Sequence, residues 1–271
     1  MTTRPRRAER SSPLPLLPPL VAGRIRSRDR RGSSSPVVVD TAAGRYLVKL
    51  RGAAQGTGTL VAEVIVGALA DRLGLPVPPR RVLQLLPDHP TDDRNDELAD
   101  LLAASIGENL GFTYLDGART LVPGEVGRLD PDFAAQVRWL DWLVQNPDRG
   151  PANPNILVQG RGFWLIDHGA ALAFQHDWSA VTEQSPHRPE APLPHLLDGH
   201  AARVAGWDPL LTALLPRETI TAAVDEVPDA FLLPLLPAGA GAEPLRRRRA
   251  AYAAFLWKRL QGPRPFAVAA R

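Results

Sequence analysis

Apolar positions in the first half of the chain form short runs and one longer periodic stretch. Residues 37–39 and 46–50 are runs of β-forming side chains on either side of a polar turn that contains Gly44, and they predict two paired strands. Over residues 60–73 the apolar side chains recur at helical spacing, and Gly74 is the stop signal of a helix. The pattern further predicts a strand over residues 81–86, a short helix over 97–104 and another strand within 107–121.

The second half of the chain has mostly helical patterning. Asp130-Pro131 is a capping signal that starts a helix. A tight hairpin is predicted around Gly160-Arg161-Gly162, with strands over residues 156–158 and 163–166. Strands followed by helices indicate an α+β fold with two lobes. The helices that follow the hairpin are expected around residues 194–204, 208–215, 217–226 and 244–260.

The positive charge of the protein is concentrated near the N-terminus. The net charge is +3, yet residues 1–31 carry nine arginines against two acidic residues, so the rest of the chain is net negative. We expect residues 1–22 to form a disordered Arg- and Pro-rich arm, residues 23–125 an N-terminal lobe and residues 126–271 a C-terminal lobe. A nucleic-acid role for the arm has no motif behind it, so a solvated tail is the favoured interpretation.

Composition excludes several classes of site. The chain has no cysteine, which excludes a disulfide scaffold, a thiolate metal centre and a cysteine nucleophile. The histidines of the second half lack the spacing of a zinc site. The chain has no run of eighteen apolar residues, so the sequence predicts no transmembrane helix. We therefore expect a cytoplasmic protein without a membrane span.

Lysine is the rare basic residue of this chain. Of 32 basic residues only Lys49 and Lys258 are lysines. A lysine is a compact point charge on a flexible stem, whereas arginine is a planar fork. A lysine kept in an arginine-biased chain indicates a position that arginine does not serve. Lys49, on a predicted strand, is therefore the first candidate for chemistry.

Five polar residues stand in an order that fits phosphoryl transfer from ATP. Lys49 lies on a strand and Glu63 on the next helix. Asp148 and Asn153 lie five residues apart in a loop, and Asp167 ends a strand. The transfer needs a lysine on the phosphates, a helix glutamate that holds it, an aspartate that orients or deprotonates the hydroxyl, and an asparagine and a second aspartate that hold Mg²⁺. Each residue alone has a structural explanation, but their joint order predicts a kinase site.

Six segments carry a family resemblance: Val48-Lys49, Glu63, Gly74-Leu75-Pro76-Val77-Pro78, Asn146-Pro147-Asp148-Arg149, Asn153-Pro154-Asn155-Ile156-Leu157 and Leu165-Ile166-Asp167-His168-Gly169-Ala170-Ala171-Leu172. Together they resemble the short branch of the HipA-like kinases, over about residues 30–260. The last segments are also similar to those of phosphatidylinositol 3- and 4-kinases. The resemblance implies an α+β, two-lobed atypical protein-kinase-like fold. It has a small β-rich N-terminal lobe with one helix and a mostly helical C-terminal lobe.

The resemblance also implies a role for each candidate residue. Lys49 would contact the ATP phosphates, and Glu63 would pair with this lysine. Asp148 would be the catalytic base, and Asn153 and Asp167 would bind Mg²⁺. ATP and Mg²⁺ are thus the implied cofactors.

Some positions stay open. Asn155 competes with Asn153 as the metal ligand, although the five-residue step from Asp148 favours Asn153. The glycine-rich loop of protein kinases is missing. Its expected substitute, which would cradle phosphate with backbone N–H groups, consists of Gly32, Ser33, Ser34 and Ser35, and residues 52–58 are a second candidate.

The residues around the loop have alternative interpretations. Arg149 either touches phosphate or holds the loop, and Asp141 would pin it. His168 is expected to pack in the core or to hydrogen-bond the catalytic loop. A strand within residues 107–117 would pack adenine or serve the core.

The phosphate acceptor implied by the resemblance is a hydroxyl, Ser or Thr on a protein. A small-molecule or lipid kinase with the same cleft is an alternative, because fold does not fix the acceptor. A non-catalytic pseudokinase that binds a nucleotide or a partner is another.

Overall fold

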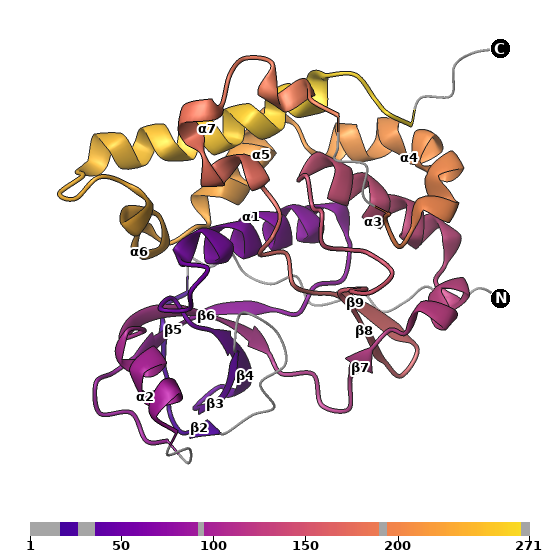
Figure 1. Cartoon of the computed structure of the whole chain (residues 1–271). Helices are drawn as coiled ribbons and strands as arrows, with labels where there is room; N and C mark the ends of the chain where they lie inside the picture. Colours follow the sequence, from indigo (N-terminus) through magenta and orange to yellow (C-terminus); the bar gives the residue numbers. More distant parts are fainter. Residues whose placement is uncertain (1–16, 27–35, 92–94, 190–193, 267–271) are drawn as a thin grey trace, which may run out of the picture.

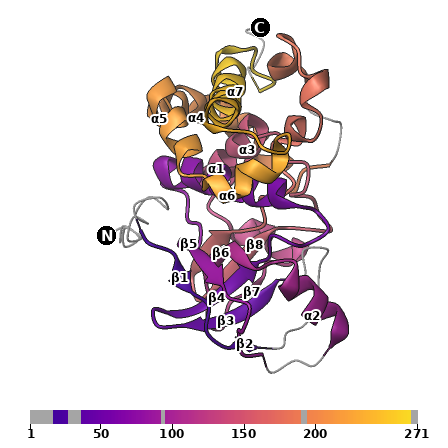
Figure 2. The ribbon, with the colours of Figure 1, turned by 90° about the vertical axis from the view of Figure 1, so that its left-hand side faces the viewer.

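The computed structural model describes residues 17–26, 36–91, 95–189 and 194–266 of the chain. They form two lobes, with a curled sheet at one end and a stack of helices at the other (Figure 1). A side view keeps the same division, with helix α1 at the junction (Figure 2). This arrangement confirms the α+β, two-lobed fold expected from the sequence. Gly32, Ser33, Ser34 and Ser35, the expected phosphate loop, lie outside the described residues.

The small lobe is built on a six-stranded sheet in the order β1-β5-β6-β4-β3-β2. All neighbours pair antiparallel except β1, which runs parallel to β5. Strand β1 lies within residues 1–22, so the described end of the predicted arm belongs to the sheet. The strands are β1 (Leu20–Val21), β2 (Ile25–Arg26), β3 (Val37–Thr41), β4 (Gly44–Lys49), β5 (Arg80–Leu85) and β6 (Gly107–Thr113).

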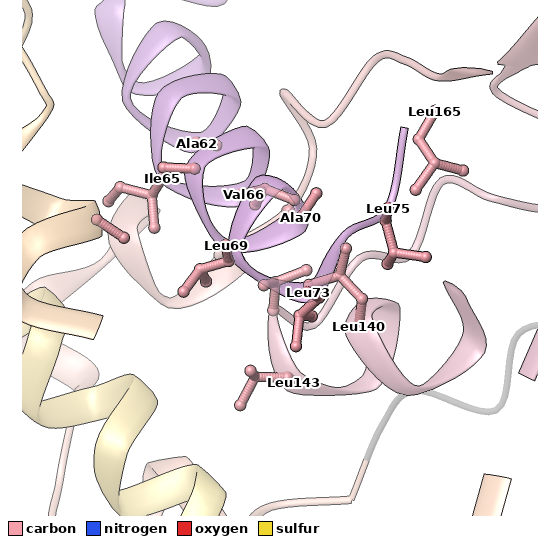
Figure 3. Close-up of a cluster of buried hydrophobic side chains, with 14 of the residues drawn as sticks. Ala62, Ile65, Val66, Leu69, Ala70, Leu73, Leu75, Leu140, Leu143 and Leu165 are labelled. Atoms are coloured by element: carbon pink, nitrogen blue, oxygen red, sulfur yellow. The ribbon is translucent and has the colours of Figure 1, made fainter. Parts of the chain in front are cut away.

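Helix α1 (Thr57–Leu73) lies between the sheet and the helical lobe (Figure 1). Fourteen of its seventeen residues are buried, because β-sheet covers one side and α5 and α6 pack on the other. Its side chains join the large hydrophobic core with Leu140 and Leu143 of the C-terminal lobe (Figure 3). It ends at Gly74, whose φ of 75° only glycine adopts at little cost.

Two ion pairs tie α1 to both lobes. Arg80 of β5 donates to Asp71 at 2.6 Å, and Arg72 reaches Glu226 beside α5 at 2.9 Å. The guanidinium of Arg80 lies flat on Gly67, where a Cβ would come within 2.5 Å of it. The C-terminal half of α1 is therefore attached to the sheet on one side and to the helical lobe on the other.

A second, smaller core lies inside the sheet. It includes Ile25, Val39, Leu83 and Leu102, and the last of these comes from α2 (Asp96–Ala103). The small lobe thus has two helices rather than one, and α2 is the short helix that the pattern over residues 97–104 predicts. Asn95 caps it by accepting from the Leu98 N–H at 3.2 Å.

A second, three-stranded sheet, in the order β7-β8-β9, lies beside the helical lobe, with the expected hairpin between β8 and β9. Where the sequence predicts two helices, around residues 194–204 and 208–215, residues 201–214 form a single helix with Pro209 inside it. The short helix α6 is not among the predicted helices. None of the helices in the described ranges is both long and apolar enough to cross a membrane. The elements are β7 (Arg119–Thr120), α3 (Pro131–Leu143), β8 (Ile156–Gln159), β9 (Gly162–Leu165), α4 (Ala201–Leu214), α5 (Arg217–Asp225), α6 (Asp229–Leu232) and α7 (Ala242–Gln261).

Candidate active site

A cleft of about 1140 Å³ opens between the two lobes. It brings together the end of β4, the linker after β6, the loop between α3 and β8, and the chain after β9. One part of its lining is apolar and the other carries charges. The residues with chemistry in its wall are Lys49, Thr59, Asp148, Asn153, Asp167 and His176.

Lys49 is the buried cation of the cleft, whereas Arg119 lies in its wall with a largely exposed side chain. It is the last residue of β4, and its Nζ forms ion pairs with Glu63 of α1 and, at 2.5 Å, with Asp167. Burial opposes the charge on Lys49, but the two carboxylates outweigh burial and raise its pKa above the usual range. Lys49 is therefore permanently charged, and its position is set by both lobes.

Glu63 lies behind this lysine and has no exposed surface. One oxygen holds Lys49, while Oε2 has no hydrogen-bond partner among the described residues. A buried carboxylate oxygen without a partner is costly. Among the described residues, Glu63 therefore has Lys49 as its hydrogen-bond partner, and α1 holds the carboxylate beside this lysine.

Asp167 projects into the cleft from a strained turn. Its φ is 58°, in the left-handed region that few non-glycine residues adopt, and 43% of its side chain is exposed. Two residues later, a Cβ on Gly169 would lie 3.3 Å from the Cβ of Thr59 in α1. The Asp-His-Gly turn is therefore packed against the start of α1, next to Glu63.

Asp148 lies across the cleft in the loop after α3. Asn153 donates from Nδ2 to both carboxylate oxygens of Asp148 at 2.9 Å. Asn155 donates to the backbone carbonyl of Asp148 at 2.8 Å and to its Oδ2 at 3.1 Å. Asn153 is exposed while Asn155 is buried with φ of 49°. Asn155 therefore fixes the loop from behind, and the Asn153 amide stands at the cleft.

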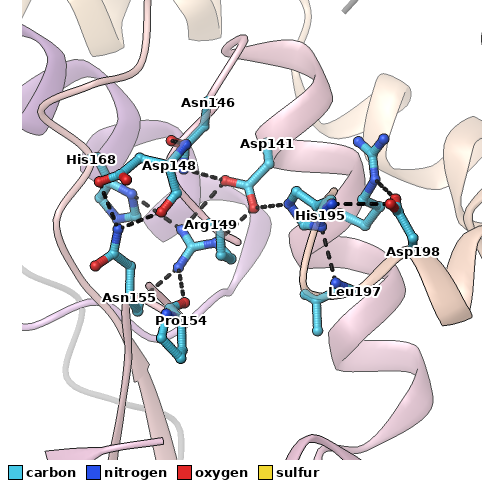
Figure 4. Close-up of polar contacts among 11 residues, drawn as sticks. Asp141, Asn146, Asp148, Arg149, Pro154, Asn155, His168, His195, Leu197 and Asp198 are labelled. Atoms are coloured by element: carbon cyan, nitrogen blue, oxygen red, sulfur yellow. Dashed lines mark hydrogen bonds and ion pairs between the residues drawn. The ribbon is translucent and has the colours of Figure 1, made fainter. Parts of the chain in front are cut away.

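The loop that carries Asp148 rests on a buried ion pair (Figure 4). Arg149, with no exposed surface, donates to Asp141 of α3 at 2.6 Å and to the Asn155 carbonyl at 2.6 Å. Asn146 adds a bond to the other Asp141 oxygen at 2.8 Å. Burial opposes ionisation of Asp141, but the Arg149 charge and the hydrogen bond from His195 hold its pKa well below the usual range.

His195 completes this network from a distant part of the chain. The Leu197 N–H donates to its Nδ1 at 3.1 Å, so the proton is on Nε2, which donates to Asp141 at 3.0 Å. The neighbouring Leu196 N–H donates to the Arg149 carbonyl at 2.9 Å. The loop that carries Asp148 is thus held by α3 and by residues 195–197.

His168 lies between the ion pair of Arg149 with Asp141 and the ion pair of Lys49 with Asp167. It is buried, and its Nδ1 lies 3.5 Å from Arg149. Burial and the Arg149 charge lower the pKa of His168 to about 3. A neutral imidazole therefore packs against the loop from the Asp-His-Gly turn.

The other end of the cleft is apolar. Leu47, Phe112, Leu157 and Ile166 line it from both lobes, and residues 113–115 run along its edge as the link between the sheets. An apolar slot beside a linker suits a planar aromatic ring. The stretch 107–117 serves the large core and the cleft at once, because Leu110 is buried in that core while Phe112 faces the cleft.

The structure brings together the five candidate residues Lys49, Glu63, Asp148, Asn153 and Asp167. Of the second phosphate-loop candidate, residues 52–58, only Gln55 borders the cleft. Sequence reasoning missed His195 as a member of the site, because it pairs with an aspartate 54 positions away. The apolar wall was missed in part, since Leu157 and Ile166 look like ordinary strand residues.

Comparison with known proteins agrees with this geometry. The family model described as HipA-like kinase matches residues 23–232. Among solved structures, a proinflammatory kinase from Helicobacter pylori, CtkA, superposes with a TM-score of 0.52 at 11% sequence identity. The match covers 90% of this chain and 98% of that one, and at this identity it concerns the fold alone. A comparison with curated protein sequences gives no match.

Proposed function

The chain belongs to the HipA-like kinase family, and we propose from this premise that it transfers the γ-phosphate of ATP to a hydroxyl acceptor with the help of Mg²⁺. The observation that carries the proposal is the meeting of Lys49 with both Glu63 and Asp167, opposite Asp148, in one open cleft. A purely structural ion pair has no need of a cleft at its side.

ATP fits the two ends of this cleft. The adenine ring takes the apolar end between Leu47 and Leu157, next to the linker. The phosphates lie at the charged end, where Lys49 neutralises them and Glu63 keeps the lysine in place. A charge that is held by protein at both sides needs little rearrangement when phosphate arrives.

Mg²⁺ fits the oxygen donors beside Lys49. Asp167 offers an exposed carboxylate, and Oδ1 of Asn153 accepts no hydrogen bond from the residues that the structure describes. The Asn153 amide can keep its N–H groups on Asp148 while its oxygen faces a cation. Magnesium in kinases is bound by one or two such side chains together with the phosphates, and it neutralises charge on them.

Asp148 receives the acceptor. Its carboxylate faces the cleft between two amide donors, which fix its direction. It orients the attacking hydroxyl and accepts its proton as the hydroxyl oxygen bonds to the γ-phosphorus, while the bond from that phosphorus to the bridging oxygen breaks and ADP leaves. A serine or threonine of a protein is the acceptor that we propose, on the analogy of the family.

The proposal is tested by the transfer of label from γ-³²P-ATP. Wild type and Asp148→Asn are incubated with Mg²⁺ and, in separate reactions, with a protein extract and with a pool of small metabolites. Asp100→Asn, on the exposed face of α2, is the matched control. We expect label on protein with wild type and the control and a large loss with Asp148→Asn.

Two other results would overturn parts of the proposal. Label that appears only on small molecules would make this a small-molecule kinase and remove the protein acceptor. Absence of label and of ATP turnover in every reaction would contradict catalysis and leave a nucleotide-binding pseudokinase.

A further inference from the structure

The chain that follows the Asp-His-Gly turn lines the acceptor side of the cleft. Gly169, Ala170 and His176 belong to the wall of the cleft, and residues 171–188 then cross the helical lobe in short 3₁₀ turns. A segment that has only short 3₁₀ turns is held in one conformation by the elements it packs against. Here that partner is α7, which lies beyond the residues matched by the family model.

A buried hydrogen bond joins α7 to the start of this segment. Tyr252 donates from its hydroxyl to Gln175 Oε1 at 2.8 Å, and the Gln175 amide donates to the Ala171 carbonyl at 3.3 Å. Tyr252 has no exposed surface, and burial raises its pKa, so the phenol keeps its proton. The bond therefore fixes the chain one residue before His176.

Aromatic contacts continue the attachment. Phe174 stacks on Phe255 of α7 with ring centroids 3.6 Å apart, and Trp178 meets Tyr252 edge to face at 4.9 Å. Arg248 covers the other side of Trp178, with its guanidinium carbon 4.6 Å from the ring centroid. Side chains at three turns of α7 thus hold one short stretch of chain.

Arg259 joins the far end of the segment to α3, the helix that precedes the Asp148 loop. It is 3% exposed and donates to the Pro186 carbonyl at 3.0 Å and the Arg188 carbonyl at 3.2 Å. Its Nε donates to the carbonyl of Trp142, in the last turn of α3, at 2.8 Å. One buried side chain therefore joins α7, the end of the segment and the helix that leads to Asp148.

We propose that α7 is a built-in clamp on residues 171–188, with Tyr252 and Arg259 as positioning residues for the acceptor side of the cleft. Many kinases order the corresponding stretch by adding a phosphate that pairs with arginine. In this chain the Tyr252 hydrogen bond, the ring contacts and the cationic side chains of α7 order it, so no added phosphate is required. The positioning role rests on the proposed function.

The test uses Tyr252→Phe in the full chain, which removes one hydroxyl and keeps the ring contacts. Tyr46→Phe is the matched control, because Tyr46 is also buried but belongs to the small core. Hydrogen exchange over residues 171–188, ATP affinity and phosphate release from magnesium-ATP are measured for each. We expect roughly fivefold faster exchange over this segment in Tyr252→Phe alone. We also expect a lower kcat and an unchanged Kd for ATP.

Exchange over residues 171–188 equal to that of the control would overturn the clamp. Faster exchange with an unchanged kcat would overturn the positioning role. Should Tyr252→Phe lower the stability of the whole chain, Gln175→Leu removes the same bond from the other side and is read in the same way. A wild type without ATP turnover contradicts the proposed function, whereas the exchange comparison still decides whether α7 holds the segment.

Discussion

The two buried cation–carboxylate groups of this site have opposite surroundings. Lys49 and Asp167 border the cleft, and 43% of the Asp167 side chain is exposed. Arg149 and Asp141 have no exposed side-chain surface, and protein groups take their remaining bonds. One group leaves room for a ligand and the other leaves none.

The choice of cation follows this difference. Arginine presents a fixed fork, and Arg149 uses it on Asp141 and two backbone carbonyls at once. Lysine presents a point charge that turns toward whichever oxygen is near, which suits a site that must also accept phosphates. The pair at Lys49 is thus suited to act on substrate, and the pair at Arg149 to hold the loop that does so.

The largest effect on stability is expected when the closed pair is broken. Arg149→Met leaves Asp141 buried beside only His195 and Asn146, and it should cost about 3–5 kcal/mol in the free energy of unfolding. Asp167→Asn should cost less, because this side chain is 43% exposed and Lys49 keeps Glu63 as a partner. Denaturant unfolding of both variants measures this. Equal losses, or a larger one for Asp167→Asn, would contradict the division of roles.

The largest effect on turnover is expected at Asp148. Asp148→Asn keeps the shape of the side chain and removes the proton acceptor, so kcat should fall about 10²–10⁴-fold. The Kd for ATP should stay within about twofold, because the residue faces the acceptor. Single-turnover kinetics with magnesium-ATP give both values. A kcat within tenfold of wild type would remove Asp148 from catalysis.

A smaller loss of turnover is expected when Lys49 becomes arginine. The charge is kept, but the planar fork cannot occupy the point between Glu63, Asp167 and phosphate, so we expect roughly a 10–100-fold lower kcat/KM. The other lysine gives the control: Lys258 lies outside the cleft wall and forms an exposed pair with Glu183 that an arginine can also make. Lys258→Arg should therefore keep this contact of α7 with residues 171–188 and leave kcat/KM unchanged. Equal behaviour of the two variants would show that the cleft does not distinguish the two cations.

The smallest effect is a change of stability with pH. The pKa of Asp141 lies well below the value of about 4 for a free aspartate, so its contribution to folding is complete above pH 4 and is lost as the pH falls further. The stability difference between wild type and Asp141→Asn should therefore shrink by about 1 kcal/mol from pH 4.5 to pH 3. Urea unfolding at both pH values measures it, and a constant difference would contradict an ionised Asp141.

The sequence predicted the site better than the packing around it. The sequence predicted that Lys49, Glu63, Asp148, Asn153 and Asp167 act together, because phosphoryl transfer needs these residue types and the family resemblance implies their order. The structure places them close together, and their roles stay predictions. The hydrogen bonds of these residues could not be predicted, because the bonds depend on φ values of 49° at Asn155 and 58° at Asp167. No local sequence pattern indicates these φ values.

Long-range contacts account for most of what the sequence did not reveal. His195 looked like an isolated histidine, because its aspartate lies in another helix. Helix α1 is buried on nearly every side, so the sheet and the helical lobe, rather than a single apolar face, decide its place. The pattern predicted two helices around residues 194–204 and 208–215, yet α4 is one helix that contains Pro209, because packing on α3 outweighs the lost hydrogen bond.

The most direct test of the account is a thermal-shift titration with ATP, with and without Mg²⁺, on wild type, Asp167→Ala and the control Asp100→Ala. ATP at a hundred times its Kd should add about 2.7 kcal/mol of stability, or roughly 5–10 °C in Tm. The account predicts a magnesium-dependent shift in wild type and the control that is lost in Asp167→Ala. A shift that is absent from wild type, or that Asp167→Ala retains in full, would contradict a magnesium-ATP site beside Lys49.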